Sequence, residues 1–389
     1  MRTRHRVVFQ DAADLSFLEA ASVELVLTSP PYPMIAMWDQ AFSRRDRQVA
    51  SALREGDGWQ AFGRMHDALD RVWREAHRVL RPGGFACIVV GDAVRSLRGR
   101  FALYPNHARI LQALLEIGFT PLPSILWRKQ TNAPTKFMGS GMYPAGAYVT
   151  LEHEHILIAR KGAPRDFTAI EEKRRRHESA LFWEERNGWY SDVWFDLKGT
   201  RQERLSASGR DRSGAFPFEL AYRLICMHTI RGDTVLDPFL GTGTTLRAAA
   251  AAGRNSVGCE IEKDLRAEIF ADPARWLPAA RHRAASRLEE HRSFVAARRA
   301  SGKTMLHESR RYGFPVITRQ ESELWIPLPA AARREAEDLW VVSYEEPPAP
   351  PAAAAPPAGG PAPPGRLPGR RRRRHPPPRQ ASFTWDESG

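Results

Sequence analysis

Short apolar runs that end at proline, glycine or an acid alternate along the chain with helical stretches, which is the pattern of an α/β protein. The run 23–28 (VELVLT) ends at a pair of prolines, and 234–236 (TVL) leads into a glycine turn and the alanine-rich stretch 246–252. A third run, 256–261 (SVGCEI), carries an acid near its end. Because alternating strands and helices build parallel crossovers, we expect one doubly wound, mostly parallel sheet with helices on both faces.

The first run opens into a rigid polar turn with the sequence Ser29-Pro30-Pro31-Tyr32. Two consecutive prolines fix the backbone and remove two amide donors, so the carbonyl groups of this turn belong to no helix. A hydroxyl group and an aromatic ring flank them. The turn can accept hydrogen bonds from an amino group, although the same string also occurs as an ordinary proline turn.

The second run opens into a glycine loop that reads Asp237-Pro238-Phe239-Leu240-Gly241-Thr242-Gly243-Thr244-Thr245. Its two glycines let the backbone pass close to a ligand, and the helix that begins behind them offers free N–H groups. No lysine follows, as a phosphate loop requires, and Leu246 breaks the dinucleotide pattern G-x-G-x-x-G. Glu260 in the third run stands where nucleoside-binding α/β folds place a ribose-binding carboxylate.

In this order, the motifs resemble those of the amino-methylating DNA methyltransferases, which move a methyl group from S-adenosylmethionine to an exocyclic amine of cytosine or adenine. The resemblance covers roughly residues 5 to 270. Its other matching segments, in chain order, are 7–11, 78–84, 87–92, 125–129, 153–158 and 215–220. A catalytic loop that precedes the cofactor loop is similar to the permuted, β-type arrangement of this family, in which the two halves still meet in one sheet.

The resemblance also implies which residues hold S-adenosylmethionine. They are Asp11, Phe216, Pro217, Asp237, Pro238, Phe239, Gly241, Gly243, Thr244 and Glu260. The loop from Asp237 to Gly243 would cradle the methionine and sulfonium portion, and Glu260 would accept hydrogen bonds from the ribose hydroxyls. Asp11 would lie near the adenine amino group, with helix capping as the alternative for a single acid at a strand end. Phe216 and Pro217 would close the methionine end.

Methylation of an exocyclic amine requires a base outside the double helix, since the amine of a paired base is hydrogen-bonded and out of reach of the cofactor. We expect the Ser29 hydroxyl and the Pro30 carbonyl to accept the two amino protons while Tyr32 stacks on the flipped base. The four residues of the turn, Pro31 included, are therefore the candidate catalytic residues. Transfer is then in-line, without a covalent enzyme intermediate. The lack of a Pro-Cys motif agrees, and it argues against methylation of the cytosine ring carbon.

The serine of the turn bears on the choice of base. Family members with Ser-Pro-Pro-Tyr lean toward the N4 of cytosine, and those with Asp-Pro-Pro-Tyr lean toward the N6 of adenine. We therefore expect N4-cytosine methylation, with N6-adenine as the alternative because either side chain can orient an amine. A methyltransferase of RNA, protein or small amines is a further alternative. A silent DNA-binding protein is another, against which the intact Ser29, Tyr32, Asp237 and Glu260 argue.

Arginine, lysine and tryptophan intermix between Arg160 and Arg212, where the resemblance places the target-recognition region (160–213). Arginine and lysine can read guanine or grip phosphate. The candidate DNA-binding residues are Arg174, Arg175, Arg176, Lys198 and Arg201. The alternative is that the tryptophans pack in the core and that 174–176 form an exposed helix face.

The charge balance favours a polyanionic partner. The formal net charge is +13, and neutralising phosphates releases counterions and steers association. We expect double-stranded DNA as the partner, with a cognate restriction endonuclease as a second candidate and a monomer or homodimer as the assembly. Part of the excess positive charge lies in the run 370–374 (RRRRR), within the proline- and alanine-rich tail 346–389. We expect this tail to be disordered. This run is either a solvated tail or a weak DNA tether.

Before the tail, the chain divides into one enzyme domain and an extension. We expect a methyltransferase domain over 1–273, with a catalytic half (1–159) and a cofactor half (214–273), and then an extension over 274–345 that contains a charged helix and a strand near 314–318. No apolar stretch approaches the roughly 20 residues of a membrane span, and no secretory signal begins the chain.

The cysteines indicate the compartment and argue against a metal site. Cys87, Cys226 and Cys259 lie in apolar runs without a C-x-x-C pair. This fits buried thiols in a reducing cytoplasm better than disulfides or zinc ligands. No metal cofactor is expected.

Overall fold

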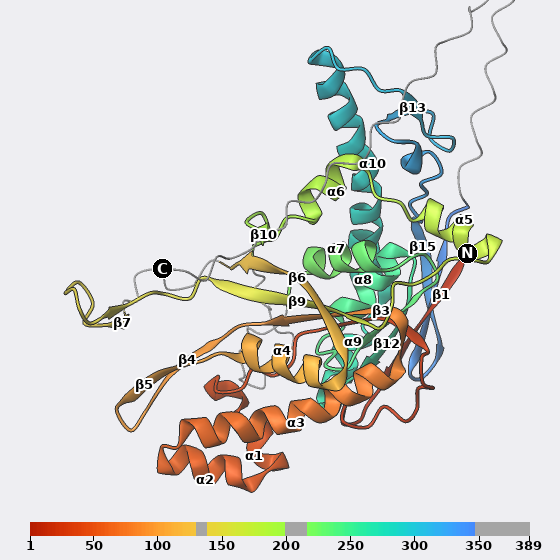
Figure 1. The fold of residues 1–389 in the computed structure, drawn as a ribbon. Helices are drawn as coiled ribbons and strands as arrows, with labels where there is room; N and C mark the ends of the chain where they lie inside the picture. Colours follow the sequence, from red (N-terminus) through yellow and green to blue (C-terminus); the bar gives the residue numbers. More distant parts are fainter. Residues whose placement is uncertain (130–137, 199–215, 347–389) are drawn as a thin grey trace, which may run out of the picture. The chain divides into compact units, whose positions relative to one another are not determined.

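A ten-stranded mixed sheet forms the centre of the computed structural model, which describes residues 1–129, 138–198 and 216–346 (Figure 1). In spatial order, its strands are β10 (Val193–Trp194), β6 (Phe119–Arg128), β9 (His153–Lys161), β3 (Leu80–Val90), β2 (Val23–Thr28), β11 (Thr234–Asp237), β12 (Asn255–Cys259), β1 (Arg2–Val8), β16 (Leu339–Tyr344) and β15 (Pro329–Ala336). The central strands from β3 to β1 are parallel. Antiparallel strands flank them, with β9 on one side and β16 on the other.

Helices cover both faces of this sheet, which confirms the predicted doubly wound architecture. In Figure 1, α3 (Gly58–Val79) and α4 (Asn106–Ile117) lie below the sheet, and α7 (Phe218–His228) lies above it. Successive side chains of strand β2 point to opposite faces of the sheet, so this strand contributes to two hydrophobic cores. Val26 packs in the cluster formed with α3 and α4, whereas Leu25 packs in the cluster of α7 and of α8 (Thr244–Ala252).

The two halves of the sequence meet where β2 lies beside β11. Val235 of β11 is in register with Leu25 of β2, and Leu236 with Val26, in a parallel pair. Parallel pairing places the carboxyl ends of both strands at one edge of the sheet, which we call the catalytic edge. The predicted joining of the halves in a single sheet is therefore observed. The first strand, β1, crosses to the far side and pairs with β12.

Further helices and hairpins around the sheet complete the fold. The remaining helices of more than three residues are α1 (Asp39–Arg45), α2 (Arg47–Glu55), α5 (Ile170–Glu178), α6 (Trp183–Trp189), α9 (Arg266–Ile269) and α10 (Leu277–Ala300). The hairpins outside the main sheet are formed by β4 (Ala93–Leu97) with β5 (Arg100–Tyr104), β7 (Met138–Gly139) with β8 (Ala147–Tyr148), and β13 (His307–Glu308) with β14 (Pro315–Val316). The first two hairpins project from the end of the sheet (Figure 1).

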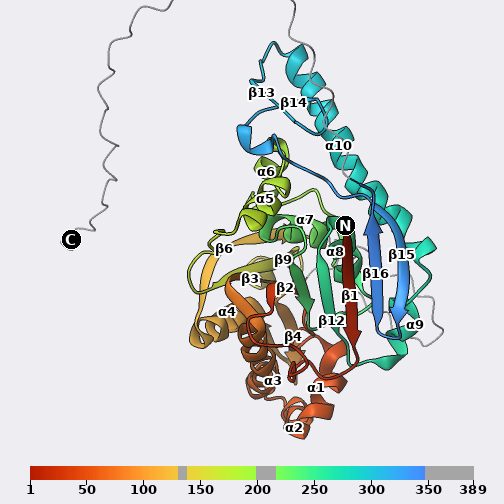
Figure 2. The same cartoon turned by 90° about the vertical axis from the view of Figure 1, so that its right-hand side faces the viewer.

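The segment 274–345 extends the main sheet. The charged helix expected there is α10, but the expected strand at 314–318 shrinks to the two residues of β14. Sequence reasoning missed β15 and β16, which continue the sheet as an antiparallel hairpin beside β1 (Figure 2). The predicted disorder of the tail concerns residues that lie outside the described part, apart from Glu346.

Two simpler predictions can be compared with the described residues. Cys87, Cys226 and Cys259 are free and buried, as expected. None of the helices in the described ranges is both long and apolar enough to cross a lipid bilayer.

Candidate active site

The polar turn and the glycine loop, far apart in the chain, are joined by a side-chain hydrogen bond. The Thr28 hydroxyl, at the end of β2 and next to Ser29, donates to Asp237 Oδ1 across 2.6 Å. Both residues are buried at the catalytic edge. The structure therefore brings the two sequence motifs to one place, as the sequence predicted.

The Asp237 carboxylate holds the start of the glycine loop in place. Besides the bond from Thr28, it accepts hydrogen bonds from the Phe239 amide at 3.0 Å and from the Thr245 hydroxyl at 2.5 Å. Burial raises the pKa of Asp237 to about 6 despite these donors. The side chain thus ties the loop to strand β2 and to the first turn of α8. This fixes the position of Pro238, which lies between the anchored residues.

The glycine loop depends on the conformational freedom of its two glycines. Gly241 and Gly243 have φ angles of +57° and +91°, which favour glycine because a Cβ atom is strained there. Gly243 caps α8, and Thr244 is the first residue of this helix. The helix N-terminus therefore points its free N–H groups at the catalytic edge.

Glu260 lies beside the loop, directly after β12. Its carboxylate accepts hydrogen bonds from the Gly241 amide at 2.7 Å and from the Glu262 amide at 2.8 Å. Its own amide donates to Val8 at the end of β1. The predicted ribose-binding carboxylate and the predicted cofactor loop are thus in direct contact.

A close approach between β12 and the loop depends on Gly258. A Cβ atom there would lie 2.5 Å from Leu240 Cδ2 and within 3.0 Å of two further atoms of that buried side chain. We expect Gly258→Ala to lower the free energy of unfolding by about 1–3 kcal/mol through overpacking, as measured by urea denaturation. Gly63→Ala is the matched control in helix α3, where a Cβ atom meets nothing within 4 Å. This change should raise stability by about 0.5–1 kcal/mol, and equal effects of both changes would contradict the steric argument.

Asp11 and the pair Phe216–Pro217 occupy the margins of this site. Asp11 follows β1; its carboxylate accepts a hydrogen bond from the Ala13 amide at 2.9 Å and pairs with Arg45 at 3.0 Å. The bond to Ala13 is a local turn contact and not the helix cap that was the alternative for this acid, because no helix begins at Asp11. Phe216 packs in the core on the α7 side of the sheet, and Pro217 is the N-cap residue of α7. Their roles at the cofactor stay predictions.

The polar turn Ser29–Tyr32, the candidate catalytic turn, takes part in a hydrogen-bonded network that sequence reasoning did not foresee. Ser29 Oγ lies 2.9 Å from the Tyr32 hydroxyl, which in turn donates to Glu154 Oε2 at 3.0 Å. Lys129 Nζ donates to the other carboxylate oxygen of Glu154 at 2.7 Å. Burial and the negative charge of Glu154 raise the pKa of Tyr32 well above its ordinary value, so Tyr32 keeps its proton. Glu154 and Lys129 lie in segments that matched the family, but no local signal marked them.

The direction of each hydrogen bond among Ser29, Tyr32 and Glu154 follows from the geometry. Tyr32 has one hydroxyl proton, and the Glu154 carboxylate is its charged acceptor. The Ser29 hydroxyl must then donate to the Tyr32 oxygen. This direction leaves the lone pairs of Ser29 Oγ able to accept a hydrogen bond from another group.

The predicted DNA-binding arginines lie at the opposite edge of the sheet from this site. Arg175 of helix α5 donates to the Arg231 carbonyl, which precedes β11, whereas Asp237 ends that strand. Arg174 pairs with Glu171 on the exposed face of α5, and Arg176 lies over the Phe167 ring. Arg174 and Arg176 are exposed, as in the exposed helix face that was the alternative for these arginines, whereas Arg175 is half-buried. A DNA contact for the three arginines stays a prediction.

The other residues named in the expected target-recognition region are partly buried in the core and partly left as predictions. Trp189 and Trp194 are buried in the core, as the alternative interpretation held, whereas Trp183 is 38% exposed. Lys198 is exposed at the limit of the described residues, and Arg201 lies outside them. A DNA contact by Lys198 or by Arg201 stays a prediction.

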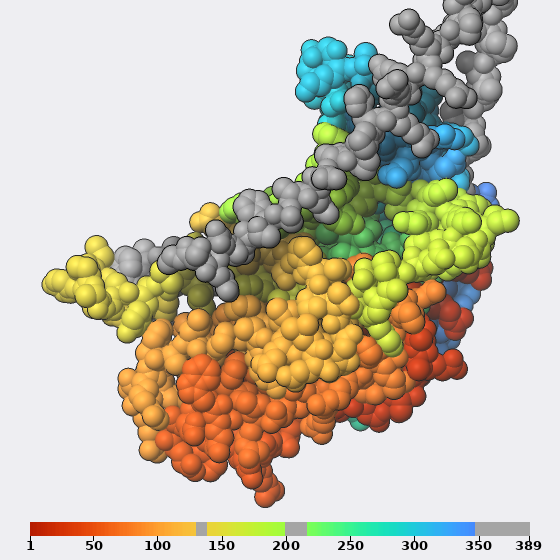
Figure 3. Space-filling model, in the orientation of Figure 1, coloured from red at the N-terminus to blue at the C-terminus, as the bar shows by residue number. Residues whose placement is uncertain are grey.

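Two hairpins that the sequence did not reveal stand at the catalytic edge. β4 and β5 follow the carboxyl end of β3, and β7 and β8 connect β6 to β9. The Phe101 ring of β5 stacks on the Tyr148 ring of β8, with centroids 4.8 Å apart and planes 7° apart. Both rings remain exposed, and Tyr143 between β7 and β8 is 77% exposed. The space-filling view shows the β7–β8 segment, in yellow, standing out from the body (Figure 3).

Comparisons with known proteins agree with one another. A DNA methylase family model, that of the N6 and N4 methyltransferases, matches residues 23–270. The chain is 46% identical to the type II methyltransferase M.MthZI of Methanothermobacter thermautotrophicus over 347 residues, which cover 89% of this chain and 96% of the relative. It is also 46% identical to the type II methyltransferase M.MjaI of Methanocaldococcus jannaschii over 275 residues, or 68% of this chain and 89% of the relative.

A solved structure shares this fold. It is a candidate DNA modification methylase of Thermus thermophilus, complexed with S-adenosyl-L-methionine. The sequence identity is 34%, the TM-score is 0.51, and the match covers 69% of this chain and 96% of that one.

Proposed function

The chain belongs to the DNA methylase family of N6 and N4 amino-methyltransferases, and from this premise we propose that it methylates the N4 amine of cytosine in double-stranded DNA. The observation that carries the proposal is the hydrogen bond from Thr28 to Asp237. It holds the polar turn beside the glycine loop, which supports a site where a methyl donor bound by one loop would face an amine bound by the other. A partner endonuclease would fit the type II methyltransferases to which the chain is similar.

The residues at the catalytic edge suit S-adenosylmethionine as the methyl donor. Its sulfonium group, when bound, supplies an activated methyl carbon. The α8 N-terminus and the glycine loop offer backbone N–H groups, and Glu260 offers a buried carboxylate for ribose hydroxyls. The cofactor complex of the Thermus thermophilus methylase supports this assignment.

The hydrogen-bonded chain from Ser29 to Glu154 accounts for both the orientation and the deprotonation of the amine. Ser29 Oγ accepts one amino proton, because its own proton is directed to Tyr32. The Pro30 carbonyl accepts the second. As the amine nitrogen is methylated it must lose a proton, and Ser29, Tyr32 and Glu154 form a path for that proton to a carboxylate. Lys129 holds this carboxylate from the other side.

The choice between cytosine and adenine is decided by product analysis. DNA methylated by the purified protein should yield N4-methylcytosine after enzymatic hydrolysis and nucleoside mass spectrometry. This expectation rests on Ser29, because family members with Ser-Pro-Pro-Tyr lean toward the N4 of cytosine and those with Asp-Pro-Pro-Tyr lean toward the N6 of adenine. N6-methyladenine alone would overturn this choice, and transfer of tritiated methyl groups only to RNA, protein or small amines would overturn the DNA substrate.

We propose that the two projecting hairpins, rather than helix α5, contact the DNA around the flipped base. They share an edge with Ser29, and the stacked Phe101 and Tyr148 rings are exposed there. Exchanging both rings for serine should raise KM for duplex DNA about tenfold at unchanged affinity for S-adenosylmethionine, since an aromatic–base contact contributes about 1–3 kcal/mol.

The comparison variant for this prediction carries alanine at Arg174, Arg175 and Arg176. These side chains lie at the far edge of the sheet, so we expect KM for DNA to change less than twofold at physiological salt. A large rise in KM for the arginine variant, with none for the hairpin variant, would instead support DNA binding by the three arginines of helix α5.

A further inference from the structure

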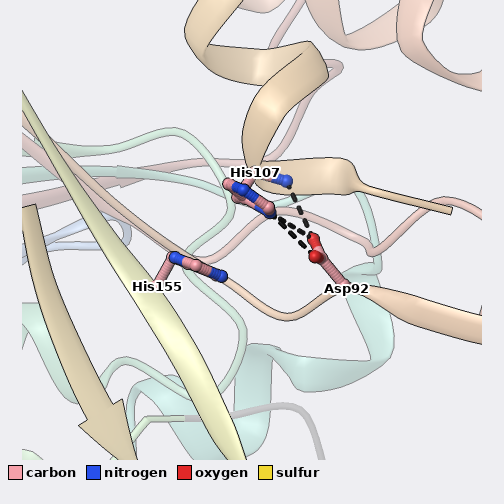
Figure 4. A group of neighbouring side chains, drawn as sticks. All are labelled: Asp92, His107 and His155. Carbon is pink, nitrogen blue, oxygen red and sulfur yellow. Dashed lines mark hydrogen bonds and ion pairs between the residues drawn. The ribbon is translucent and has the colours of Figure 1, made fainter. Parts of the chain in front are cut away.

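Two histidines and an aspartate from three separate elements converge close to the catalytic turn. Asp92 lies just after β3, His107 is in the first turn of α4, and His155 lies on β9 opposite Val90. One possible ligand atom from each side chain lies within 4.8 Å of those of the other two, and all three side chains are half-buried. Figure 4 shows the carboxylate and the two rings grouped together.

Helix capping explains only part of this arrangement. Asp92 accepts hydrogen bonds from the His107 amide at 3.1 Å and from His107 Nδ1 at 2.8 Å, so it caps a backbone N–H group in the first turn of α4 from a distant part of the chain. The His155 ring stacks on the His107 ring, with centroids 3.9 Å apart and planes 13° apart. Within the described part of the chain, nothing hydrogen-bonds to the ring nitrogens of His155. A second imidazole beside the Asp92–His107 pair is therefore not needed for the cap.

We propose that Asp92, His107 and His155 bind a divalent transition-metal ion of the zinc type. Two imidazoles and one carboxylate are ligands that suit Zn²⁺ and its neighbours, and three protein ligands leave a position for water. An ion at the centre of three atoms no more than 4.8 Å apart lies at most about 2.8 Å from each of them. Zinc bonds to nitrogen and oxygen are about 2.0–2.2 Å long, so the three atoms must each move by less than about 1 Å. One of the two stacked imidazole rings must also rotate, because a metal ion binds in the plane of each ring.

The bound ion would act as a clamp behind the catalytic turn. Asn106, the neighbour of His107, donates from Nδ2 to the Pro33 carbonyl at 3.1 Å and to the Gly91 carbonyl at 3.0 Å. Gly91 also lies against the Tyr32 ring, since a Cβ atom there would be 3.3 Å from Tyr32 Cε2. An ion that joins the end of β3, the start of α4 and β9 would hold these contacts together. Metal binding itself does not depend on the proposed function.

Titration of the chelator-treated full chain with Zn²⁺ tests this proposal. Calorimetry should give one strong site per chain, Zn²⁺ should raise Tm, and Co²⁺ should give the visible absorption of a low-symmetry nitrogen–oxygen site. Mg²⁺, which prefers all-oxygen octahedral sites, should give none of these responses. No binding of Zn²⁺ by the unmodified chain would overturn the proposal.

Variants then locate the site. His155→Ala removes no hydrogen bond and should weaken Zn²⁺ binding at least tenfold and abolish the rise in Tm, and Asp92→Asn should do the same. His282→Ala is the matched control, because His282 is exposed on α10 and lies outside the metal-binding group. Circular dichroism establishes that each variant is folded. Zn²⁺ affinity that is unchanged in both site variants, or lost only in His282→Ala, would refute the site.

Discussion

Replacing Ser29 with alanine should lower kcat about 100- to 1,000-fold while the affinity for S-adenosylmethionine is retained, since removal of one preorganised hydrogen-bonding group in an active site typically has this effect. Ser29 Oγ is directed by Tyr32 so that its lone pairs are available to the amine. The glycine loop and Glu260, which we assign to the cofactor, keep their contacts in this variant. Single-turnover methyl transfer and cofactor titration measure the two quantities separately.

The control for this prediction is Ser22→Ala. Ser22 precedes the same strand β2 at its other end, where its hydroxyl donates to the Glu19 carbonyl. We expect turnover to stay within about twofold of the unmodified enzyme, because this hydroxyl is exposed and remote from the catalytic edge. Unchanged turnover in Ser29→Ala would refute the assigned role of Ser29.

Replacing Glu154 with glutamine should also lower the single-turnover rate about 100-fold or more. Glutamine can still accept a hydrogen bond from Tyr32, but it cannot take up the proton that leaves the amine. Proton transfer by a positioned group is typically worth about 10²- to 10⁴-fold. If Glu154 only positioned Tyr32, the amide would replace it at little cost, and a rate near that of the unmodified enzyme would reject the proton path.

Glu152→Gln is the matched control for this second prediction. Glu152 lies two residues earlier and pairs with Arg128 at the surface, with a side chain that is 42% exposed. Its replacement should leave the rate unchanged. The double variant of Ser29→Ala with Glu154→Gln gives a further check. The fold-decrease in its single-turnover rate should be much smaller than the product of the fold-decreases of the two single variants, because residues of one proton path act as a unit.

Local sequence predicted the parts of the molecule whose structure depends on neighbouring residues. The double-proline turn follows its strand, and Gly241 and Gly243 adopt the left-handed conformations that the loop needs. The alternation of strands and helices along the chain correctly indicated a sheet that is covered on both faces. The order of the motifs predicted that the two halves of the chain share a sheet, and the β2–β11 pair shows this.

The position of helix α5 is a feature that local reasoning could not supply. A run of three arginines indicates a charged helix face, but it carries no information about which edge of the sheet the helix covers. That choice depends on the packing of α5 beside Arg231 and on the Arg165–Asp233 ion pair at the amino end of β11. Likewise, β15 and β16 are recognisable as part of the main sheet only through their pairing with β1.

The sequence by itself determined the chemistry of the two loops, because the conformations of proline, glycine and a strand end are set within a few residues. Tertiary structure alone decided which groups stand behind the catalytic turn. Glu154 is 122 residues from Tyr32 and reaches it because β9 runs antiparallel beside β3. The same pairing brings His155 to Asp92 and His107. Strand register is fixed by long-range hydrogen bonds and by burial, and neither of these can be derived from a local pattern of residues.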